Sequence, residues 1–345
     1  MSRASLHVGI VGAGAIGGFF AAELIHAGCT VALLGRSDRA DALPCIRWNG
    51  ERLVPSAPQR VTGDYAVLRE VSVCLVTLKS TETRAAAAKI ANHLPPGAPV
   101  VSFQNGLDNC ETLRAELGAR VAAGVVGYNV NASADGVRRQ ATSGKLYVDA
   151  LTGEPADHLR SLSGAFTRGG DQLELRRDID AVVSGKLLLN LNNGVCAATG
   201  LGIEASIADP DARWCFAEAI REALVVLRAA GYRPARVATI PPPLLAHALS
   251  LPDWIVGRLA RAIARVGPDA RSSTLQDLDN RKTTEIRSLN GAIVNLAKRV
   301  GRPAPANDAV TSAVIEHERS IEQGASPRFV PPRELRRRIE SMMKR

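Results

Sequence analysis

The feature that most constrains this chain is a glycine-rich turn between a short apolar strand and a helix, close to the start of the sequence. The expected strand, residues 6–11, runs directly into residues 12–17, which read Gly-Ala-Gly-Ala-Ile-Gly. Apolar residues at helical spacing follow as far as Gly28, and a second apolar strand is expected at residues 31–34. The pattern G-x-G-x-x-G therefore stands in the strand, turn and helix context that dinucleotide binding requires.

Each residue of this turn has a separate physical task. Gly12 permits the tight turn, Gly14 lets the backbone approach a diphosphate, and Gly17 lets the helix pack close to the strand. Ala15 and Ile16 open the helix, whose N-terminus presents N–H groups and a partial positive charge to the diphosphate. We predict that all five contact the cofactor.

The end of the second strand indicates which dinucleotide binds. An NAD site usually carries Asp or Glu there to hold the ribose 2′-hydroxyl, whereas an NADP site favours Arg beside the 2′-phosphate. Here the first polar side chain after the strand is Arg36, and Asp38 lies past the usual position. Because a guanidinium matches a phosphate bidentately, we expect NADPH/NADP+ as the cofactor. The alternative interpretation is that Arg36 is an ordinary solvated cation of a loop.

The charge balance is basic, with 43 Lys and Arg against 34 Asp and Glu, a net charge of +9. These cations are spread along the chain without interleaved aromatic residues, so the pattern does not favour a nucleic-acid partner. A basic site for a phosphorylated cofactor and a small anionic substrate explains part of the excess.

The six cysteines are scattered, mostly in apolar segments, with no C-x-x-C pair, and the six histidines show no metal-ligand spacing. We interpret the cysteines as reduced core residues of a cytoplasmic protein and expect no metal site. The apolar stretch at residues 8–25 contains several glycines and Glu23. These argue against a signal or membrane-spanning segment, so we expect no association with a membrane.

Strands and helices alternate through the first half of the chain. A hairpin is expected at residues 45–54, around the turn pair Asn49-Gly50, and an Ala-rich helix at residues 83–94. Further strands are expected at residues 71–78, 99–103, 120–126, 145–150 and 172–175. The alternation predicts an α/β N-terminal domain, residues 1–177, with a Rossmann-type doubly wound parallel sheet that binds NADP.

From residue 178 the pattern changes to a 3.6-residue periodicity, with no convincing strand. The first helix, capped by Asp178 or Asp180, runs towards Ala198. Further helices are expected at residues 212–230, 244–249, 254–265, 283–300 and 309–323. We predict an all-α C-terminal domain, residues 178–325, to which the family resemblance described below assigns substrate binding and dimerisation. A basic C-terminal tail, residues 326–345, follows, with a helix from Pro332.

A polar stripe interrupts the first of these helices. Lys186, Asn190 and Asn193 lie at positions i, i+4 and i+7, hence on one face, within a run rich in leucine. Such a stripe needs either buried partners or a cavity that uses it. A solvent-facing stripe is the alternative, but solvated stripes usually carry several charges, and Lys186 is the only one here.

Residues 271–286 are dense in hydroxyl and charged side chains, and the expected helix continues from there through Leu289 and Ile293. By itself this stretch reads as a surface segment, and its spacing alone does not single out Glu285.

Taken together, these motifs resemble those of ketopantoate reductases, also called 2-dehydropantoate 2-reductases. The resemblance covers about residues 6–325 and has motifs in both predicted domains. The segments that carry it, in chain order, are the Gly12 turn, Val76-Thr77-Leu78-Lys79, Gln104-Asn105-Gly106, Lys186 with Asn190, Ser273 through Glu285-Ile286, and Pro305-Ala306-Asn307. The family reduces 2-dehydropantoate to pantoate with NADPH, on the route to pantothenate and coenzyme A.

The resemblance implies roles for residues on the cofactor side. Arg36 and Lys79 are similar to the contacts of the cofactor phosphates, and Asn105 to the residue at the junction of cofactor and substrate. The resemblance also implies a homodimer formed through the helical domain.

On the substrate side, the resemblance implies that Lys186 is the general acid. Asn190 and Ser273 would hold substrate oxygens, and Glu285 would bind the substrate's hydroxyl or orient the lysine. The chemistry suits these residue types, because a positioned ammonium stabilises the charge that hydride transfer leaves on a ketone oxygen and donates its proton. The sequence does not fix the pKa of Lys186, since burial lowers it and a neighbouring carboxylate raises it.

The chain departs from the family pattern in the substrate half. Many members carry another asparagine further along the Lys186 helix, where this chain has Gly194-Val195-Cys196; either Asn193 substitutes for it or the pocket differs. A related reductase of another branched 2-oxo acid or an imine is therefore the alternative function. The non-enzymatic alternative is an NADP-binding sensor protein.

Overall fold

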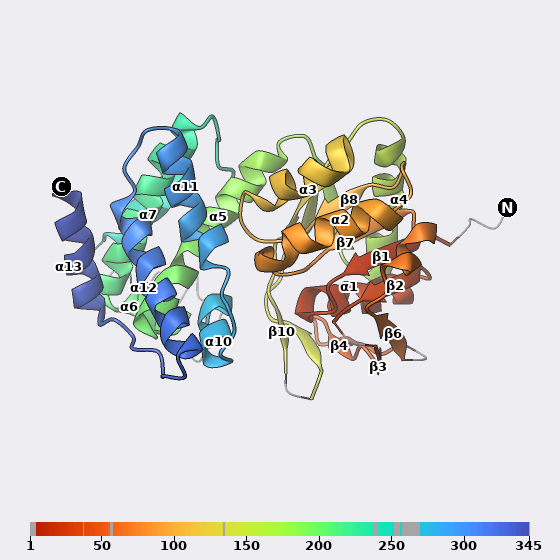
Figure 1. The fold of residues 1–345 in the computed structure, drawn as a ribbon, viewed down its shortest axis with the longest axis horizontal. Coiled ribbons are helices and arrows are strands. Elements are labelled where there is room, and N and C mark those ends of the chain that lie inside the picture. The colour runs from red at the N-terminus through yellow and green to blue at the C-terminus, as the bar shows by residue number, and fades with distance from the viewer. Residues whose placement is uncertain are drawn as a thin grey trace. The chain divides into compact units, whose positions relative to one another are not determined.

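The computed structural model describes residues 5–36, 38–55, 58–133, 135–236, 241–251, 256 and 270–344. The chain divides into two compact units, shown in Figure 1. Unit 1 comprises Met1–Gln104 and Asp108–Ile179, and unit 2 comprises Asn105–Leu107 and Asp180–Arg345. The helix predicted at residues 254–265 lies, apart from Val256, outside the described residues.

In the described part of unit 1, nine strands form one sheet in the order β13-β12-β9-β8-β7-β1-β2-β6-β3. Neighbours from β6 to β9 pair in parallel, while β3 is antiparallel to β6 and β12 is antiparallel to β9. The mostly parallel, doubly wound sheet predicted from the sequence is therefore confirmed. The strands are β1 (His7–Val11), β2 (Thr30–Leu34), β3 (Arg39–Asp41), β6 (Gln59–Thr62), β7 (Val73–Val76), β8 (Val100–Ser102), β9 (Val121–Val126), β12 (Leu146–Asp149) and β13 (Leu173–Arg176).

The central strands are apolar throughout because helices cover both faces of the sheet. In β7, Val73 and Leu75 pack into one core, whereas Cys74 and Val76 pack into the other. This alternation follows from the two-residue period of a strand. The first core contains side chains of α1 (Ala15–His26) and α4 (Glu154–Gly169), and the second those of η1 (Tyr65–Glu70), α2 (Thr83–His93) and α3 (Asn109–Leu117).

A smaller sheet joins strands from two distant parts of unit 1, in the order β10-β11-β4-β5. The predicted hairpin is confirmed: β4 (Cys45–Ile46) and β5 (Arg52–Leu53) pair antiparallel around a turn in which Gly50 has φ +86°. β10 (Val130–Ala132) and β11 (Arg138–Gln140) were not predicted. Each is only three residues long, and β11 is entirely polar, so neither has an apolar pattern of its own.

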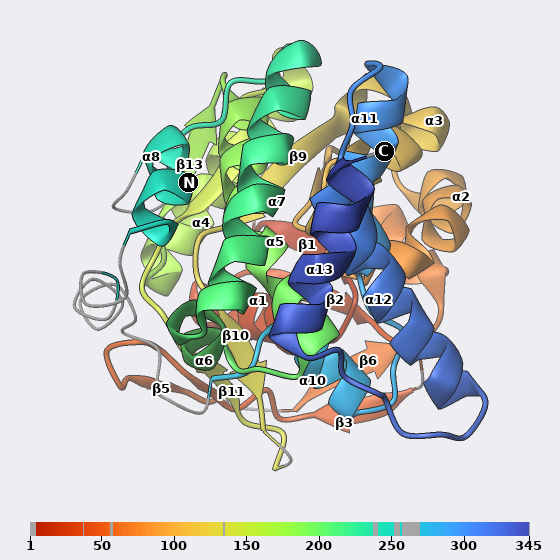
Figure 2. The same cartoon turned by 90° about the vertical axis from the view of Figure 1, so that its left-hand side faces the viewer.

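Unit 2 is helical in every segment that the structure describes, as predicted. α5 (Ile179–Thr199) carries the polar stripe, and α7, α12 and α13 pack against one another in one apolar core (Figure 2). The remaining bounds are α6 (Ile203–Ala208), α7 (Pro210–Ala229), α8 (Pro242–Leu249), α10 (Ser273–Asp279), η4 (Ile286–Ser288), α11 (Asn290–Arg299), α12 (Pro305–Glu322) and α13 (Pro332–Met343). None of the described helices is long and apolar enough to span a membrane.

The continuous helix predicted at residues 283–300 is wrong in its first third. α10 ends at Asp279, Arg281 has φ +54°, and only a 3-10 turn precedes α11. The reason lies in a distant partner: the backbone N–H and the hydroxyl of Thr284 both donate to the buried carboxylate of Glu318, at 2.8 and 2.7 Å. These bonds tie the segment to α12 and leave Glu285 in a loop between helices.

The helix of the basic tail is an integral part of the core of unit 2. Leu335 and Ile339 on α13 are fully buried in it. Beside these residues, the guanidinium of Arg336 lies 4.8 Å from the ring centre of Trp214 and 3.0 Å from Asp211, both on α7. This arginine of the tail therefore takes part in the packing of α13 on α7.

If α13 is part of the core, shortening its buried side chains must destabilise the protein. We expect Ile339→Ala to lower the free energy of unfolding by about 2–5 kcal/mol, since it removes a fully buried branched chain. Met343→Ala, at an exposed position of the same helix, should change it by less than about 0.5 kcal/mol. Urea denaturation followed by circular dichroism measures both. Equal, small effects would show that α13 is only a tail.

Candidate active site

The glycine turn of unit 1 is held by contacts that leave no room for side chains at two of its three glycines. Gly12 has φ +120°, and its N–H donates to the carbonyl of Leu34 at 3.0 Å. A Cβ on Gly12 would lie 2.8 Å from the backbone nitrogen of Leu78. A Cβ on Gly17 would lie 1.8 Å from the carbonyl oxygen of Gly12 and 2.5 Å from the hydroxyl of Thr77.

Gly14 is different, because the space beside it is open. It is exposed, it caps α1, and no heavy atom lies within 4 Å of the position that its Cβ would take. Ala15 and Ile16 form the first turn of the helix, where backbone N–H groups lack intrahelical partners. The turn thus offers an uncovered helix N-terminus, and this arrangement fits a cofactor diphosphate.

Past the end of β2, the polar side chains differ in how they are held. Arg36 is exposed at a bend. Asp38 accepts a hydrogen bond from the backbone N–H of Gly63 at 2.9 Å and lies 3.7 Å from the guanidinium of Arg60. The Gly63 bond is the main reason why the pKa of Asp38 lies below its ordinary value. Lys79 follows β7 and is partly exposed directly before the 3-10 turn η2 (Ser80–Glu82).

In unit 2, three chain segments that are far apart in sequence bring polar side chains together. The amide of Asn105 donates to a carboxylate oxygen of Glu285 at 3.3 Å, and the amide of Asn190 donates to Asn105 Oδ1 at 3.5 Å. Gly106 makes this approach possible: it has φ +98°, and a Cβ there would lie 2.3 Å from the carbonyl oxygen of Ser288. The turn at 105–107 therefore packs directly on η4.

Lys186 lies one helical turn before Asn190 on α5. Part of the residue is exposed, but protein atoms surround its ammonium closely enough for burial to lower the pKa to about 8. The negative charge of Glu285 raises it in opposition. The structure thus brings together Lys186, Asn190, Asn105 and Glu285, a group that we call the lysine cluster. Its lysine is mostly protonated at neutral pH and loses its proton more easily than an ordinary lysine.

Two other predicted residues, Ser273 and Asn193, are not joined to the lysine cluster by the hydrogen bonds described above. Ser273 is exposed as the first residue of α10, and its buried neighbour Ser272 caps that helix. The hydroxyl of Ser272 donates to the carbonyl oxygen of Asn193 at 3.4 Å, which ties α10 to α5. The sequence analysis missed Ser272, although a serine directly before a helix is the usual N-terminal cap.

Position 194 faces a second residue that the sequence analysis missed. A Cβ on Gly194 would lie 2.2 Å from Asn290 Oδ1 and 2.8 Å from Val310 Cγ1. Asn290 is fully buried, and its amide donates to Asn307 Oδ1 at 3.2 Å, while its own Oδ1 has no hydrogen-bond partner. The Asn290 carboxamide therefore occupies the space that a longer side chain at position 194 would need. Among the described residues, no group of His, Cys, Asp and Glu is placed to hold a metal ion.

Comparison with known families assigns both halves of the chain to one family. The family model "Ketopantoate reductase PanE/ApbA" matches residues 8–153, and its C-terminal counterpart matches residues 178–318. The chain belongs to the ketopantoate reductase family. Members of this family are oxidoreductases that act on a CH–OH group and use a pyridine nucleotide, so the predicted family and enzyme class are confirmed.

Individual relatives match along most of their length. The 2-dehydropantoate 2-reductase of Halobacterium salinarum is 28% identical over 303 residues, covering 85% of this chain and 92% of the relative. That of Mesorhizobium japonicum is 27% identical over 337 residues, covering 90% and 97%. The solved structure of a PanE/ApbA family ketopantoate reductase from Ralstonia eutropha JMP134 has a TM-score of 0.75 at 27% identity, covering 92% of this chain and 99% of that one.

The same fold also occurs in an enzyme with another substrate. A D-mandelate dehydrogenase, solved with NADH and anilino(oxo)acetate, has a TM-score of 0.74 at 16% identity and covers 92% of this chain. The fold class is thus confirmed by two solved structures, but the fold alone decides neither the acid nor the dinucleotide.

The glycine turn generates a prediction that separates binding from stability. Gly14→Ala should change the free energy of unfolding by less than about 1 kcal/mol, because its Cβ meets no protein atom. It should weaken NADPH binding at least about tenfold, because the methyl group occupies the space for the diphosphate. Gly17→Ala should instead destabilise the fold by about 1–3 kcal/mol or more through overlap with Gly12. Calorimetric titration and thermal denaturation of both variants provide the measurements. Unaltered NADPH affinity in Gly14→Ala would mean that the cofactor does not approach this turn.

Proposed function

We propose that this protein reduces 2-dehydropantoate to pantoate with NADPH, the reduction that leads towards pantothenate and coenzyme A. The observation that carries the proposal is the lysine cluster, in which an acidic ammonium lies among one carboxylate and two carboxamides. The family and the names of the relatives supply the substrate.

The residues of unit 1 support NADPH as the dinucleotide. When bound, the cofactor supplies the hydride that reaches the ketone carbon. In the proposal, the N-terminus of α1 binds the diphosphate, and Arg36 and Lys79 bind the additional phosphate. Asp38, a carboxylate near the end of β2, accepts the N–H of Gly63 and lies 3.7 Å from the guanidinium of Arg60. The exposed guanidinium of Arg36, which matches a phosphate bidentately, carries the preference for a phosphate over a hydroxyl at that point.

Lys186 acts as the general acid in the proposed reaction. At neutral pH, below its pKa of about 8, its ammonium donates a proton to the ketone oxygen as negative charge develops there. A lowered pKa helps, because a general acid works best when its pKa lies near the operating pH, where it is still protonated and yet gives up its proton readily. Burial alone would push the lysine further towards the neutral form, and Glu285 opposes that effect.

The carboxamides and Glu285 hold the substrate and the lysine in place. The chain of hydrogen bonds from Asn190 through Asn105 to Glu285 fixes the orientation of all three side chains. In the proposal, Asn105, Asn190, Asn193 and Ser273 face the substrate oxygens, because carboxamides and hydroxyls bind them without added charge. Glu285 binds the substrate's hydroxyl or orients Lys186.

A related 2-oxo acid is the second candidate substrate, and the observation in its favour is at position 194. By the resemblance, many family members carry an asparagine in this part of the helix, where this chain has Gly194, Val195 and Cys196, and Asn290 occupies the space beside Gly194. In this second proposal, the difference changes which 2-oxo acid the protein accepts. The predicted homodimer through unit 2 and the cytoplasmic location stay predictions.

The first test is NADPH oxidation with 2-dehydropantoate, 2-oxoisovalerate and pyruvate, each repeated with NADH. We expect selective turnover of 2-dehydropantoate with NADPH. Selective turnover of another 2-oxo acid would retain the reductase and replace the substrate. Binding of NADPH without turnover of any of these acids would favour the sensor protein.

Removing the general acid should abolish most turnover without affecting the cofactor. We expect Lys186→Ala to lower kcat at least about 10²-fold and to leave the Kd for NADPH within about twofold. Lys282→Ala, which removes an exposed lysine of the same unit, serves as the matched control and should retain full activity. If Lys186→Ala turned over at the normal rate, the assignment of Lys186 would be wrong.

The pH profile tests the coupling between Lys186 and Glu285. The rate of reduction should fall as pH rises through about 8, because the general acid loses its proton there. In Glu285→Gln, the charge that raises the lysine's pKa is gone, so this alkaline limb should move to lower pH. The measurement is kcat/KM between pH 5.5 and 9.5 for the unaltered protein and for Glu285→Gln. A limb that stays in place, or moves to higher pH, would contradict the coupling.

A further inference from the structure

A second arginine lies close to the end of β2, and its environment differs from that of its neighbours. Arg39 begins β3, and its guanidinium folds back towards Gly35, the residue that follows β2. The position of a Cβ on Gly35 lies 3.6 Å from Arg39 Nη1 and 3.2 Å from Ala13 Cβ, which belongs to the glycine turn. Arg39 therefore reaches the place where a dinucleotide fold reads the ribose of the adenosine half.

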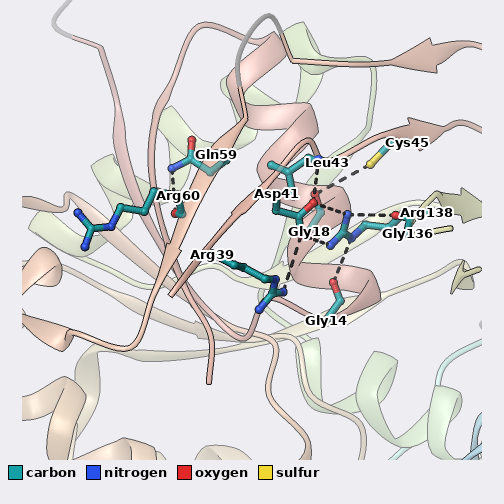
Figure 3. Close-up of polar contacts among 10 residues, drawn as sticks. All are labelled: Gly14, Gly18, Arg39, Asp41, Leu43, Cys45, Gln59, Arg60, Gly136 and Arg138. Carbon is teal, nitrogen blue, oxygen red and sulfur yellow. Dashed lines mark hydrogen bonds and ion pairs between the residues drawn. The ribbon is translucent and has the colours of Figure 1, made fainter. Parts of the chain in front are cut away.

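Arg39 has a carboxylate nearby, but that carboxylate is held by other donors. Asp41 lies 3.8 Å from Arg39 Nη2, which is too far for a hydrogen bond. The guanidinium of Arg138 donates to both oxygens of Asp41, at 2.7 and 3.3 Å, and the backbone N–H of Leu43 donates to Oδ1 at 2.9 Å. Figure 3 shows Asp41 between the two arginines. Arg39, which is 42% exposed, thus keeps donor capacity for another anion.

Arg138 is itself fixed at the glycine turn. It is 8% exposed, comes from β11 of the small sheet, and packs so closely on α1 that a Cβ on Gly18 would lie 2.1 Å from its Nε. Its guanidinium also donates to the carbonyl oxygens of Gly14 and Gly136, each at 3.4 Å (Figure 3). One buried cation therefore connects the glycine turn with β3, the strand that carries Arg39.

Building on the proposed function, we propose that Arg39 is a second cationic contact for the 2′-phosphate of NADPH, beside Arg36. Arg138 is the positioning residue: by donating to both oxygens of Asp41, it keeps that carboxylate 3.8 Å from Arg39, beyond hydrogen-bond distance. A phosphate with two negative charges binds best between two guanidinium groups, each of which offers parallel N–H donors. Neither contact exists with NADH, which carries a hydroxyl in place of the phosphate, so the two arginines discriminate between the dinucleotides.

The test compares the Kd values of NADPH and NADH by calorimetric titration of the full chain. Arg39→Ala should raise the Kd for NADPH about tenfold, as expected for one lost charge-assisted contact. The Kd for NADH should stay within about twofold. The fragments 2′,5′-ADP and 5′-AMP should reproduce this difference. Arg160→Ala, which removes an exposed arginine from α4, is the control for loss of charge alone and should affect neither dinucleotide.

The experiment separates failure of this inference from failure of the proposed function. If the unaltered protein binds NADH as tightly as NADPH and Arg36→Ala changes nothing, the proposed cofactor is wrong and Arg39 loses its role as well. If the unaltered protein prefers NADPH, Arg36→Ala abolishes the preference, and Arg39→Ala retains it, only the inference about Arg39 is overturned.

The positioning role of Arg138 has a test of its own. In Arg138→Met, Asp41 loses its closest partner and forms a hydrogen bond with Arg39 instead. The affinity for NADPH should therefore fall several-fold more than the affinity for NADH. Adding Asp41→Asn to that variant removes the competing charge and should restore the preference for NADPH. If Arg138 had a merely structural role, the affinities for both dinucleotides would fall by the same factor, and Asp41→Asn would not restore the preference for NADPH. That result would overturn the positioning role, whereas Arg39→Ala still tests the contact on a variant with an intact core.

Discussion

The chemistry proposed for this chain depends on one electrostatic constraint, the placement of the Lys186 ammonium in surroundings that disfavour its charge. A buried cation is stable only when a carboxylate or strong acceptors lie near it. Glu285 meets this need, but it can do so only because the chain leaves its helical path between α10 and α11. Thr284 and the buried carboxylate of Glu318 hold that irregular segment in place. A contact between this loop and α12, outside the lysine cluster, therefore determines where the proton donor's counter-charge lies.

In unit 1 the comparable constraint is steric. Gly12 and Gly17 are required because backbone and Thr77 occupy the positions of their side chains, whereas Gly14 is required only if a ligand takes the space beside it. The same motif thus contains two glycines for packing and one for binding. Arg138 connects this turn with the next part of the sheet, because it donates both to the carbonyl oxygen of Gly14 and to Asp41 of β3.

The sequence could predict what local periodicity and chain order control. The apolar strands, the helix that follows the turn, and the shared face of Lys186 and Asn190 all follow from spacing within one element. Sequence spacing could not predict the break that frees Glu285, because residues in a different helix cause it. The contact of Arg138 with the glycine turn was also missed, since it joins positions more than a hundred residues apart through a strand without an apolar pattern. Neither the spacing of residues nor the fold identifies the substrate or the dinucleotide.

The short turn at residues 105–107 belongs to unit 2, although the chain on both sides of it belongs to unit 1. The two units are therefore not consecutive modules. A single cut in the chain cannot separate all residues of unit 1 from all residues of unit 2. A recombination that exchanged everything after residue 179 between two family members would leave Asn105 behind with its old neighbours. Such an exchange would join a lysine and glutamate from one parent to an asparagine turn from the other. Evolution of substrate preference in this fold is thus restricted to changes that keep three separate stretches of sequence compatible.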